Sequence, residues 1–160
     1  MTARNTHETG IIVDPDIPLV RIIKEFDAPP EKVFRAHADP ELFAQWNGPR
    51  RHRMETDQFD CRTGGSYRYR LVSGGNEYGF YGSFHEVRPS ELIVQTFTYA
   101  GEPDGVALER IVFEDLGHGR TRLTATSLVD SFEGRDAFVA SGMEVGVREG
   151  YERLDDLLAR

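Results

Sequence analysis

"SGMEVGVREGYERLDDLLAR", residues 141–160, has the apolar spacing of a closing helix, yet it carries glycine at three positions four residues apart. We expect a long helix that follows "DSFEGRDA" and runs to the chain end. Its predicted apolar face consists of Val139, Met143, Gly146, Gly150, Leu154 and Leu157. Each glycine costs about 1 kcal/mol relative to alanine in a helix, so the stripe Gly142, Gly146 and Gly150 needs compensation. Either another backbone passes close by, or the space is kept free for another molecule. We expect free space at Gly146 and close packing at Gly150.

Six segments with the composition of strands precede this helix. They are residues 54–60, 65–73, 76–87, 91–99, 106–115 and 120–129. Short turns such as "SGGN" and "LGHG" separate them, so we expect hairpins and an antiparallel sheet. In the second segment Tyr67 and Tyr69 alternate with Arg68 and Arg70, which predicts one aromatic face and one solvated face.

The first part of the chain predicts one more strand and two short helices. Residues 19–26, "LVRIIKEF", are rich in β-branched side chains, and residues 30–46 have helical spacing that is interrupted at "ADP". Residues 1–17 are polar and turn-rich, so we expect a flexible arm followed by a single domain over 18–160. Seven strands and a helix that covers one sheet face define an α+β fold.

Composition and charge exclude several classes of protein. A formal net charge of −8 repels phosphate backbones, so we expect no nucleic-acid partner. No apolar run reaches the length of a membrane span, so we expect no membrane insertion. The single Cys61 cannot form an internal disulfide, which is typical of a reducing compartment, and we therefore expect a cytoplasmic location.

Motifs for metal binding and nucleophilic catalysis are missing from the sequence. The five histidines are scattered without metal-ligand spacing, and the serines lie in no nucleophile elbow. Glycine pairs fall between predicted strands, where they form turns rather than phosphate loops. We expect no metal and no cofactor, we expect His37 and His85 to be surface or half-buried side chains, and catalytic residues stay unassigned.

Five segments, in this order and spacing, resemble one known superfamily. They are "VFRAHADPELFAQWNGP", "GGSYRYR", "GSFHEVRPSELIVQTFTY", "GRTRLTATS" and "GMEVGVREGYERLDDLLA". The chain resembles the START-like, pollen-allergen-like (SRPBCC) superfamily, and within it the activator-of-heat-shock-ATPase homologues, also called polyketide-cyclase-like. The resemblance implies a helix-grip fold, in which a seven-stranded antiparallel sheet wraps around a long C-terminal helix. It also implies an apolar cavity between sheet and helix. This chain departs from the family's tryptophan pattern at Val147 and at Trp46, which Asn47 follows.

The resemblance, together with the aromatic face, predicts the residues that line this cavity. They are Trp46, Tyr67, Tyr69, Phe80, Phe97, Phe113, Phe138, Met143, Gly146 and Val147. Such aromatics also fill ordinary cores, and Trp46 is either a residue at the cavity mouth or a helix-end residue packed on the sheet. Buried tyrosine hydroxyls need partners, which favours polar groups or water inside the domain.

The function expected from these observations is binding of a small hydrophobic or aromatic molecule in the cavity, as a carrier, sensor or sequestering protein. A cyclase, dehydratase or hydrolase acting on a polyketide-like compound is the alternative from another class. A co-chaperone-like partner of a heat-shock ATPase is the third. We expect a monomer or a homodimer.

Overall fold

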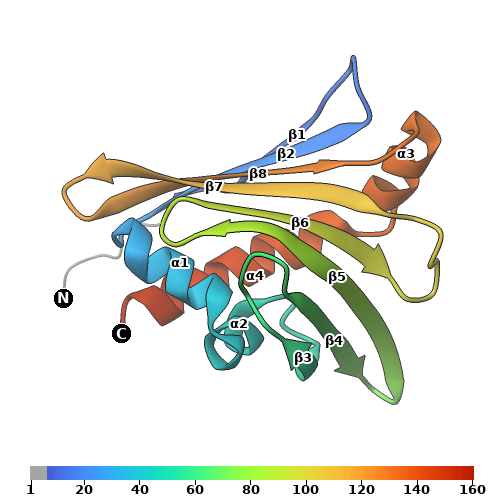
Figure 1. Cartoon of the computed structure of the whole chain (residues 1–160), viewed down its shortest axis with the longest axis horizontal. Coiled ribbons are helices and arrows are strands. Elements are labelled where there is room, and N and C mark those ends of the chain that lie inside the picture. The colour runs from blue at the N-terminus through green and yellow to red at the C-terminus, as the bar shows by residue number, and fades with distance from the viewer. Residues whose placement is uncertain (1–6) are drawn as a thin grey trace.

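The computed structural model describes residues 7–160 as one antiparallel sheet with helices along it (Figure 1). In chain order the elements are β1 (Gly10–Val13), β2 (Leu19–Phe26), α1 (Pro30–Ala38), α2 (Pro40–Trp46), β3 (Arg53–Phe59), β4 (Ser66–Ser73), β5 (Asn76–Arg88), β6 (Leu92–Tyr99), β7 (Ala107–Gly117), β8 (Arg120–Leu128), α3 (Phe132–Ala140) and α4 (Met143–Leu158). The strand order in the sheet is β1-β2-β8-β7-β6-β5-β4-β3, and neighbouring strands are antiparallel. The predicted α+β class and antiparallel sheet are confirmed.

The helices cover one face of the curved sheet, as expected for a helix grip. In Figure 1, α4 runs along this face, and α1 and α2 lie beside its C-terminal half. We call the face toward α4 the inner face and the opposite one the outer face. On β4, Tyr67, Tyr69 and Leu71 are buried, whereas Arg68 is exposed, as the alternation predicts. Among residues 7–160, no helix has both the length and the apolar character needed to cross a bilayer.

β1 is an eighth strand, formed within the segment expected to be a flexible arm over residues 1–17. Residues 10–13 pair with residues 20–23 of β2, and Asp14 closes the connection by accepting hydrogen bonds from the amides of Asp16 and Ile17. The arm prediction is therefore wrong for β1, because residues 10–13 gain a hydrogen-bonded partner strand in β2, which their β-branched side chains fit. Residues 1–6 lie outside the described part of the chain.

Residues preceding β1 are fastened to the C-terminal helix. The ammonium of Lys24, on β2, is buried, lies 2.8 Å from an Asp155 carboxylate oxygen of α4 and also donates to the His7 carbonyl. Arg148 of α4 donates to the Thr9 carbonyl. These contacts place residues 7–9 beside α4 at the β2 side of the sheet.

The expected single closing helix is instead two helices, which is a second correction. α3 ends at Ala140, and Gly142 adopts a left-handed conformation with φ of 89° immediately before α4 begins. Residues that carry a side chain rarely adopt this backbone conformation. Gly142 therefore allows the break between the two helices and does not belong to a helical stripe. Arg135 of α3 is buried and donates to the Asp14 carbonyl at 2.7 Å, which fixes α3 against the β1–β2 connection.

The two remaining glycines of the stripe face the connection between α2 and β3. A Cβ atom added to Gly150 would lie 3.1 Å from the Trp46 carbonyl oxygen and 3.4 Å from the Gly48 nitrogen. At Gly146 the nearest atom would be Pro49 Cδ at 3.4 Å, an ordinary van der Waals distance. The close packing expected at Gly150 is confirmed, although the partner is a loop. Gly146 has room for a methyl group but faces Pro49 rather than open space.

The core at the α1–α2 end contains a buried histidine, contrary to the expectation for His37. Its Nδ1 lies 2.8 Å from the Val33 carbonyl, and its ring packs against Trp46 and Phe113 at centroid distances of 4.7 and 5.2 Å. Burial lowers the pKa of His37 to about 4. Trp46 is only 5% exposed and donates from Nε1 to the Ala36 carbonyl at 2.9 Å.

Alanine substitutions at the two helical glycines should have opposite effects. Gly150→Ala should lower the free energy of unfolding by about 1–3 kcal/mol, because the methyl group would press on loop backbone. Gly146→Ala should be neutral or stabilising by up to about 1 kcal/mol, because it improves helix propensity where there is space. Urea unfolding of both variants measures this difference, and equal effects at both sites would contradict it.

His37 should make the fold sensitive to acid. Its folded pKa of about 4 lies below the ordinary 6.5, so the unfolded chain binds more protons in that window and stability falls as the pH is lowered through it. Between pH 7 and a pH well below 4, this difference in proton binding lowers the free energy of unfolding by about 3 kcal/mol. Urea unfolding at pH 7 and pH 4.5 should give a smaller difference for His37→Gln than for the wild type. The exposed-site control His85→Gln should behave like the wild type.

Candidate functional site

A polar row crosses the inner face of the sheet beneath α4. The strand registers place Glu109 of β7 opposite Gln95 of β6 on one side and Ser127 of β8 on the other, with Val20 of β2 next in the row. Along β7, Glu109 shares the inner face with Ile111, because alternate strand residues point the same way. A carboxylate thus lies among apolar side chains in the middle of the sheet.

The Glu109 carboxylate has one neutral hydrogen-bond donor of good geometry and no ion-pair partner among residues 7–160. Gln95 Nε2 donates to Glu109 Oε1 at 3.0 Å. Ser127 Oγ is buried and lies near enough to favour the ionised form of Glu109, but it makes no hydrogen bond of acceptable geometry. Burial dominates over both contacts and raises the pKa of Glu109. The row therefore has hydrogen-bonding capacity that the described residues leave partly unused.

Three tyrosines lie near enough to this carboxyl group to be affected by its charge. Burial raises the pKa of Tyr67 and Tyr69 on β4 and of Tyr151 on α4, and the negative charge of Glu109 raises each of them further. These phenols stay neutral in the physiological range and act as hydrogen-bond donors or acceptors. Tyr67 donates to the Thr96 carbonyl at 2.6 Å.

An aromatic ladder extends from the polar row toward the N-terminal end of β5 and the C-terminal end of β6. Its members are Tyr67, Tyr69, Phe80, Phe97 and Tyr99. Successive ring centroids lie 6.0 Å apart for Tyr67 and Tyr69, 5.5 Å for Tyr69 and Phe80, and 5.3 Å for Phe80 and Phe97. Phe80 and Phe97 are only half-buried, and Tyr99 is 38% exposed. The ladder therefore changes from buried to accessible along its length.

The structure places the ten predicted cavity residues in three regions. Tyr67, Tyr69, Phe80 and Phe97 come together in the aromatic ladder, and the half-buried Val147 of α4 packs against the same core. Trp46 and Phe113 lie in the core at the α1–α2 end. Trp46 is connected to the ladder through Phe43, whose ring contacts both Trp46 and Tyr69, and it also stacks on Tyr151 at 5.9 Å. Phe138, Met143 and Gly146 lie near the α3–α4 break or against Pro49. Their contact with a ligand stays a prediction.

Sequence reasoning missed the polar row and Tyr151. A signal was present in "ALERIVF", residues 107–113, where strand alternation puts Glu109 on the same side as Ile111 and Phe113. A charged residue in an apolar strand register is an indication of an internal polar site. Tyr151 gave no comparable signal, because an aromatic residue on an amphipathic helix is usual.

This arrangement can bind a molecule with an aromatic body and one polar end. The carboxyl group accepts a hydrogen bond when ionised and donates one when protonated, so it also has the chemistry of a general acid or base. Among residues 7–160, no group of three or more histidine, cysteine, aspartate or glutamate side chains has a geometry suited to a metal ion.

Three solved structures are similar to this chain over most of its length. A crystal structure from Rhodobacter sphaeroides is 26% identical, with a TM-score of 0.83 and coverage of 94% of this chain and 97% of that one. A crystal structure from Chromobacterium violaceum is 26% identical, with a TM-score of 0.77 and coverage of 89% and 98%. A solution structure from Arthrobacter aurescens is 24% identical, with a TM-score of 0.86 and coverage of 94% and 91%, and it supports the fold alone. No curated protein sequence matches the chain.

A curved antiparallel sheet with a C-terminal helix along its inner face defines the START-like class of α+β domain. Residues 27–159 match the family described as Activator of Hsp90 ATPase homolog 1-like protein. The chain belongs to this family, as its sequence segments indicate.

Glu109 should lower stability at neutral pH. Because its folded pKa is raised, the favourable protonated state is present at low pH and is lost as the pH rises through the folded pKa. Glu109→Gln keeps an acceptor for Gln95 without the buried charge, so it should raise the free energy of unfolding more at pH 7.5 than at pH 4.5. Urea unfolding at both pH values measures this, with the exposed Glu102→Gln as the control. A destabilised Glu109→Gln protein at pH 7.5 would contradict the assignment.

Proposed function

We propose that the chain binds a small aromatic or apolar molecule with one polar end between the inner face of the sheet and α4. The observation that carries the proposal is the half-buried Glu109 carboxyl group on the inner face, which has no cation partner among residues 7–160 and lies near enough to Tyr67 and Tyr69 of the aromatic ladder for its charge to affect their pKa values. A buried carboxyl costs stability unless it is paired, so its presence fits a group that pairs with a ligand. Membership of a START-like family supports the same conclusion.

The aromatic ladder and the polar row recognise different parts of the proposed ligand. Phe80 and Phe97 contact the aromatic body through their half-buried rings, while Glu109 accepts a hydrogen bond from an N–H or O–H group of the ligand. Val147 closes the site from the helix side. The ligand therefore combines a flat apolar body with a hydrogen-bond donor. The cytoplasmic location and the monomeric or homodimeric state stay predictions.

A pair of matched probes tests this function. N-phenyl-1-naphthylamine carries an N–H donor, and phenyl naphthyl ether has nearly the same shape without one. We expect one-to-one binding of the amine with micromolar affinity, and weaker binding of the ether. Phe97→Ala should weaken both probes about fivefold to tenfold, because an aromatic contact is lost. Glu109→Gln should weaken the amine more than the ether.

Leu108→Ala is the matched control for these titrations. Leu108 adjoins Glu109 on β7 but points to the outer face and is 47% exposed, so its loss should leave both affinities unchanged. Equal binding of the probes by wild type and Phe97→Ala, measured by fluorescence and calorimetry, would exclude the inner face as the site.

A second function, catalysis on a polyketide-like compound, is favoured by one feature of the same site. A carboxyl group with a raised pKa beside the neutral phenols of Tyr67 and Tyr151 is suited to transferring protons within a bound substrate. In that case Glu109→Gln should abolish turnover of such a compound while Phe97→Ala lowers its affinity. Unchanged turnover in Glu109→Gln would leave binding as the function.

A further inference from the structure

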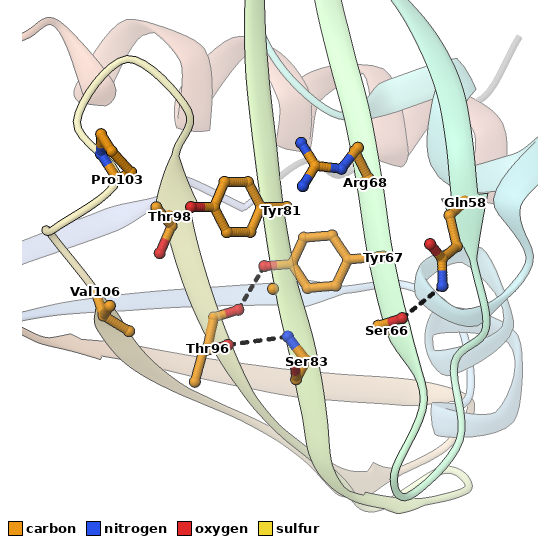
Figure 2. A pocket seen from close by; sticks show the side chains of 11 residues that line it. Gln58, Ser66, Tyr67, Arg68, Tyr81, Ser83, Thr96, Thr98, Pro103 and Val106 are labelled. Carbon is orange, nitrogen blue, oxygen red and sulfur yellow. Dashed lines mark hydrogen bonds between the residues drawn. The ribbon is translucent and has the colours of Figure 1, made fainter.

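The outer face of the sheet carries a depression that lies apart from the inner face. Its volume is about 440 Å³, and β3 to β6 and the β6–β7 connection contribute its lining. Figure 2 shows Arg68 and Tyr81 on the strands in the middle, Gln58 and Ser66 on one side, and Pro103 and Val106 of the connection on the other. The lining combines one cation, several hydroxyl groups and a small apolar wall.

Arg68 differs from its neighbour Arg70 on the same face of β4. Arg70 forms ion pairs with Glu55, Asp57 and Glu77 at 3.0–3.1 Å. Arg68 forms no ion pair within residues 7–160, and its guanidinium instead lies 4.5 Å from the centre of the Tyr81 ring. Asp57 is close enough to sense the Arg68 charge but is engaged by Arg70.

The Arg68 guanidinium lies over the Tyr81 ring, and the Arg68 side chain is exposed. A guanidinium that stacks on an aromatic face keeps its N–H groups in the plane, where they bind the two oxygens of a carboxylate or phosphate. Other arginines of residues 7–160, such as Arg21 and Arg110, also form no ion pair, but Arg68 is the cation among the residues that line the depression. The depression therefore has a preformed donor for an oxyanion.

An irregularity in the sheet forms the floor of the depression. Tyr81 is paired with Thr98 and Phe84 with Gln95, so the ladder between β5 and β6 is interrupted at residues 82–83. Here the amide of Ser83 donates to Thr96 Oγ1 at 2.9 Å, and Tyr67 donates to the Thr96 carbonyl (Figure 2).

Only glycine fits at position 82, because an added Cβ would lie 1.9 Å from the Thr96 oxygen. Position 82 lies between the outer-face residues Tyr81 and Ser83, so the missing side chain belongs to the inner face, where the Tyr67 hydroxyl would lie 2.7 Å from an added Cβ.

We propose that this depression binds a small hydroxylated organic oxyanion, such as a sugar acid or a sugar phosphate, with its charged group on the edge of the Arg68 guanidinium. The hydroxyl groups of Ser66, Ser83 and Thr98 pair with those of the ligand, and the apolar wall of Pro103 and Val106 contacts its C–H face. The site shares Tyr67 with the inner face but opens on the outer face, and it does not depend on a ligand at the inner face.

Titration of the full chain, followed by the backbone amide signals in NMR spectra, tests the proposal with glucuronate, glucose 6-phosphate and neutral glucose. We expect saturable shifts at Arg68, Tyr81 and Ser83 with at least one of the oxyanions, and much weaker ones with glucose. Binding by one oxyanion alone identifies the charged group. Arg68→Gln should weaken binding about tenfold or more, because a charge-assisted bidentate contact is lost. Arg88→Gln, an exposed site at the end of β5, should leave it unchanged.

A second pair of variants separates charge from shape at the apolar wall. Val106 is 50% exposed, so Val106→Asp and Val106→Asn should both fold, and only the aspartate should strongly weaken binding of the oxyanion. Equal affinity for glucose and both oxyanions, equal losses in Arg68→Gln and Arg88→Gln, no saturable shift, or shifts confined to inner-face residues such as Gln95 would each overturn the proposal.

Discussion

The contact between α4 and the loop that follows α2 determines where the helix lies above the sheet. At Gly150 the Trp46 carbonyl and the Gly48 backbone approach the helix so closely that an added Cβ would lie only 3.1 Å from the Trp46 oxygen, tighter than most such contacts. Arg153 strengthens the contact by donating to the Gln45 carbonyl at 2.7 Å, and Trp46 stacks on Tyr151 directly above the core. A helix fixed so firmly by one half does not need close packing along its other half.

The N-terminal half of α4 accordingly has a different environment. Val147 is half-buried, Val145 is 52% exposed, and the break at Gly142 separates this half from α3. The partly accessible end of the aromatic ladder, at Tyr99, is likewise less well covered than the core around Trp46. Because one end of α4 is fixed and the other end is less covered, part of the aromatic ladder stays accessible without loss of the fold. The core at the α1–α2 end supplies the stability with which the fold tolerates a half-buried carboxyl at Glu109.

Much of the fold could be predicted from local patterns, and the parts that could not depend on contacts distant in sequence. Strand alternation and turn residues predicted β2 to β8, and the spacing around "ADP" predicted α1 and α2, because these signals are local. β1 was missed because four residues among glycine and prolines become a strand only by pairing with β2. The break at Gly142 was missed because an apolar period continues across it in sequence although the chain changes direction. For the candidate site, aromatics on the inner face were predictable from alternation, whereas the partnership of Glu109 with Gln95 depends on the register between β6 and β7.

Tyr67 connects the two faces of the sheet and explains why both carry polar features at the same place. Its ring belongs to the inner aromatic ladder, where Glu109 influences its pKa, but its hydroxyl donates to Thr96 at the interruption between β5 and β6. Gly82 is required there because the Thr96 carbonyl, turned away from the ladder, occupies the position of a Cβ atom. Here the Tyr67 phenol takes the place of a backbone N–H as the donor to the Thr96 carbonyl. The pairing between β5 and β6 can therefore be interrupted locally without leaving this carbonyl unpaired. One tyrosine thus supports an internal hydrogen-bonding site and an external depression, and a change at Tyr67 would disturb both. For this reason Arg68 on the outer face and Phe97 on the inner face, which each belong to one face alone, are the residues whose substitution distinguishes the two proposed sites.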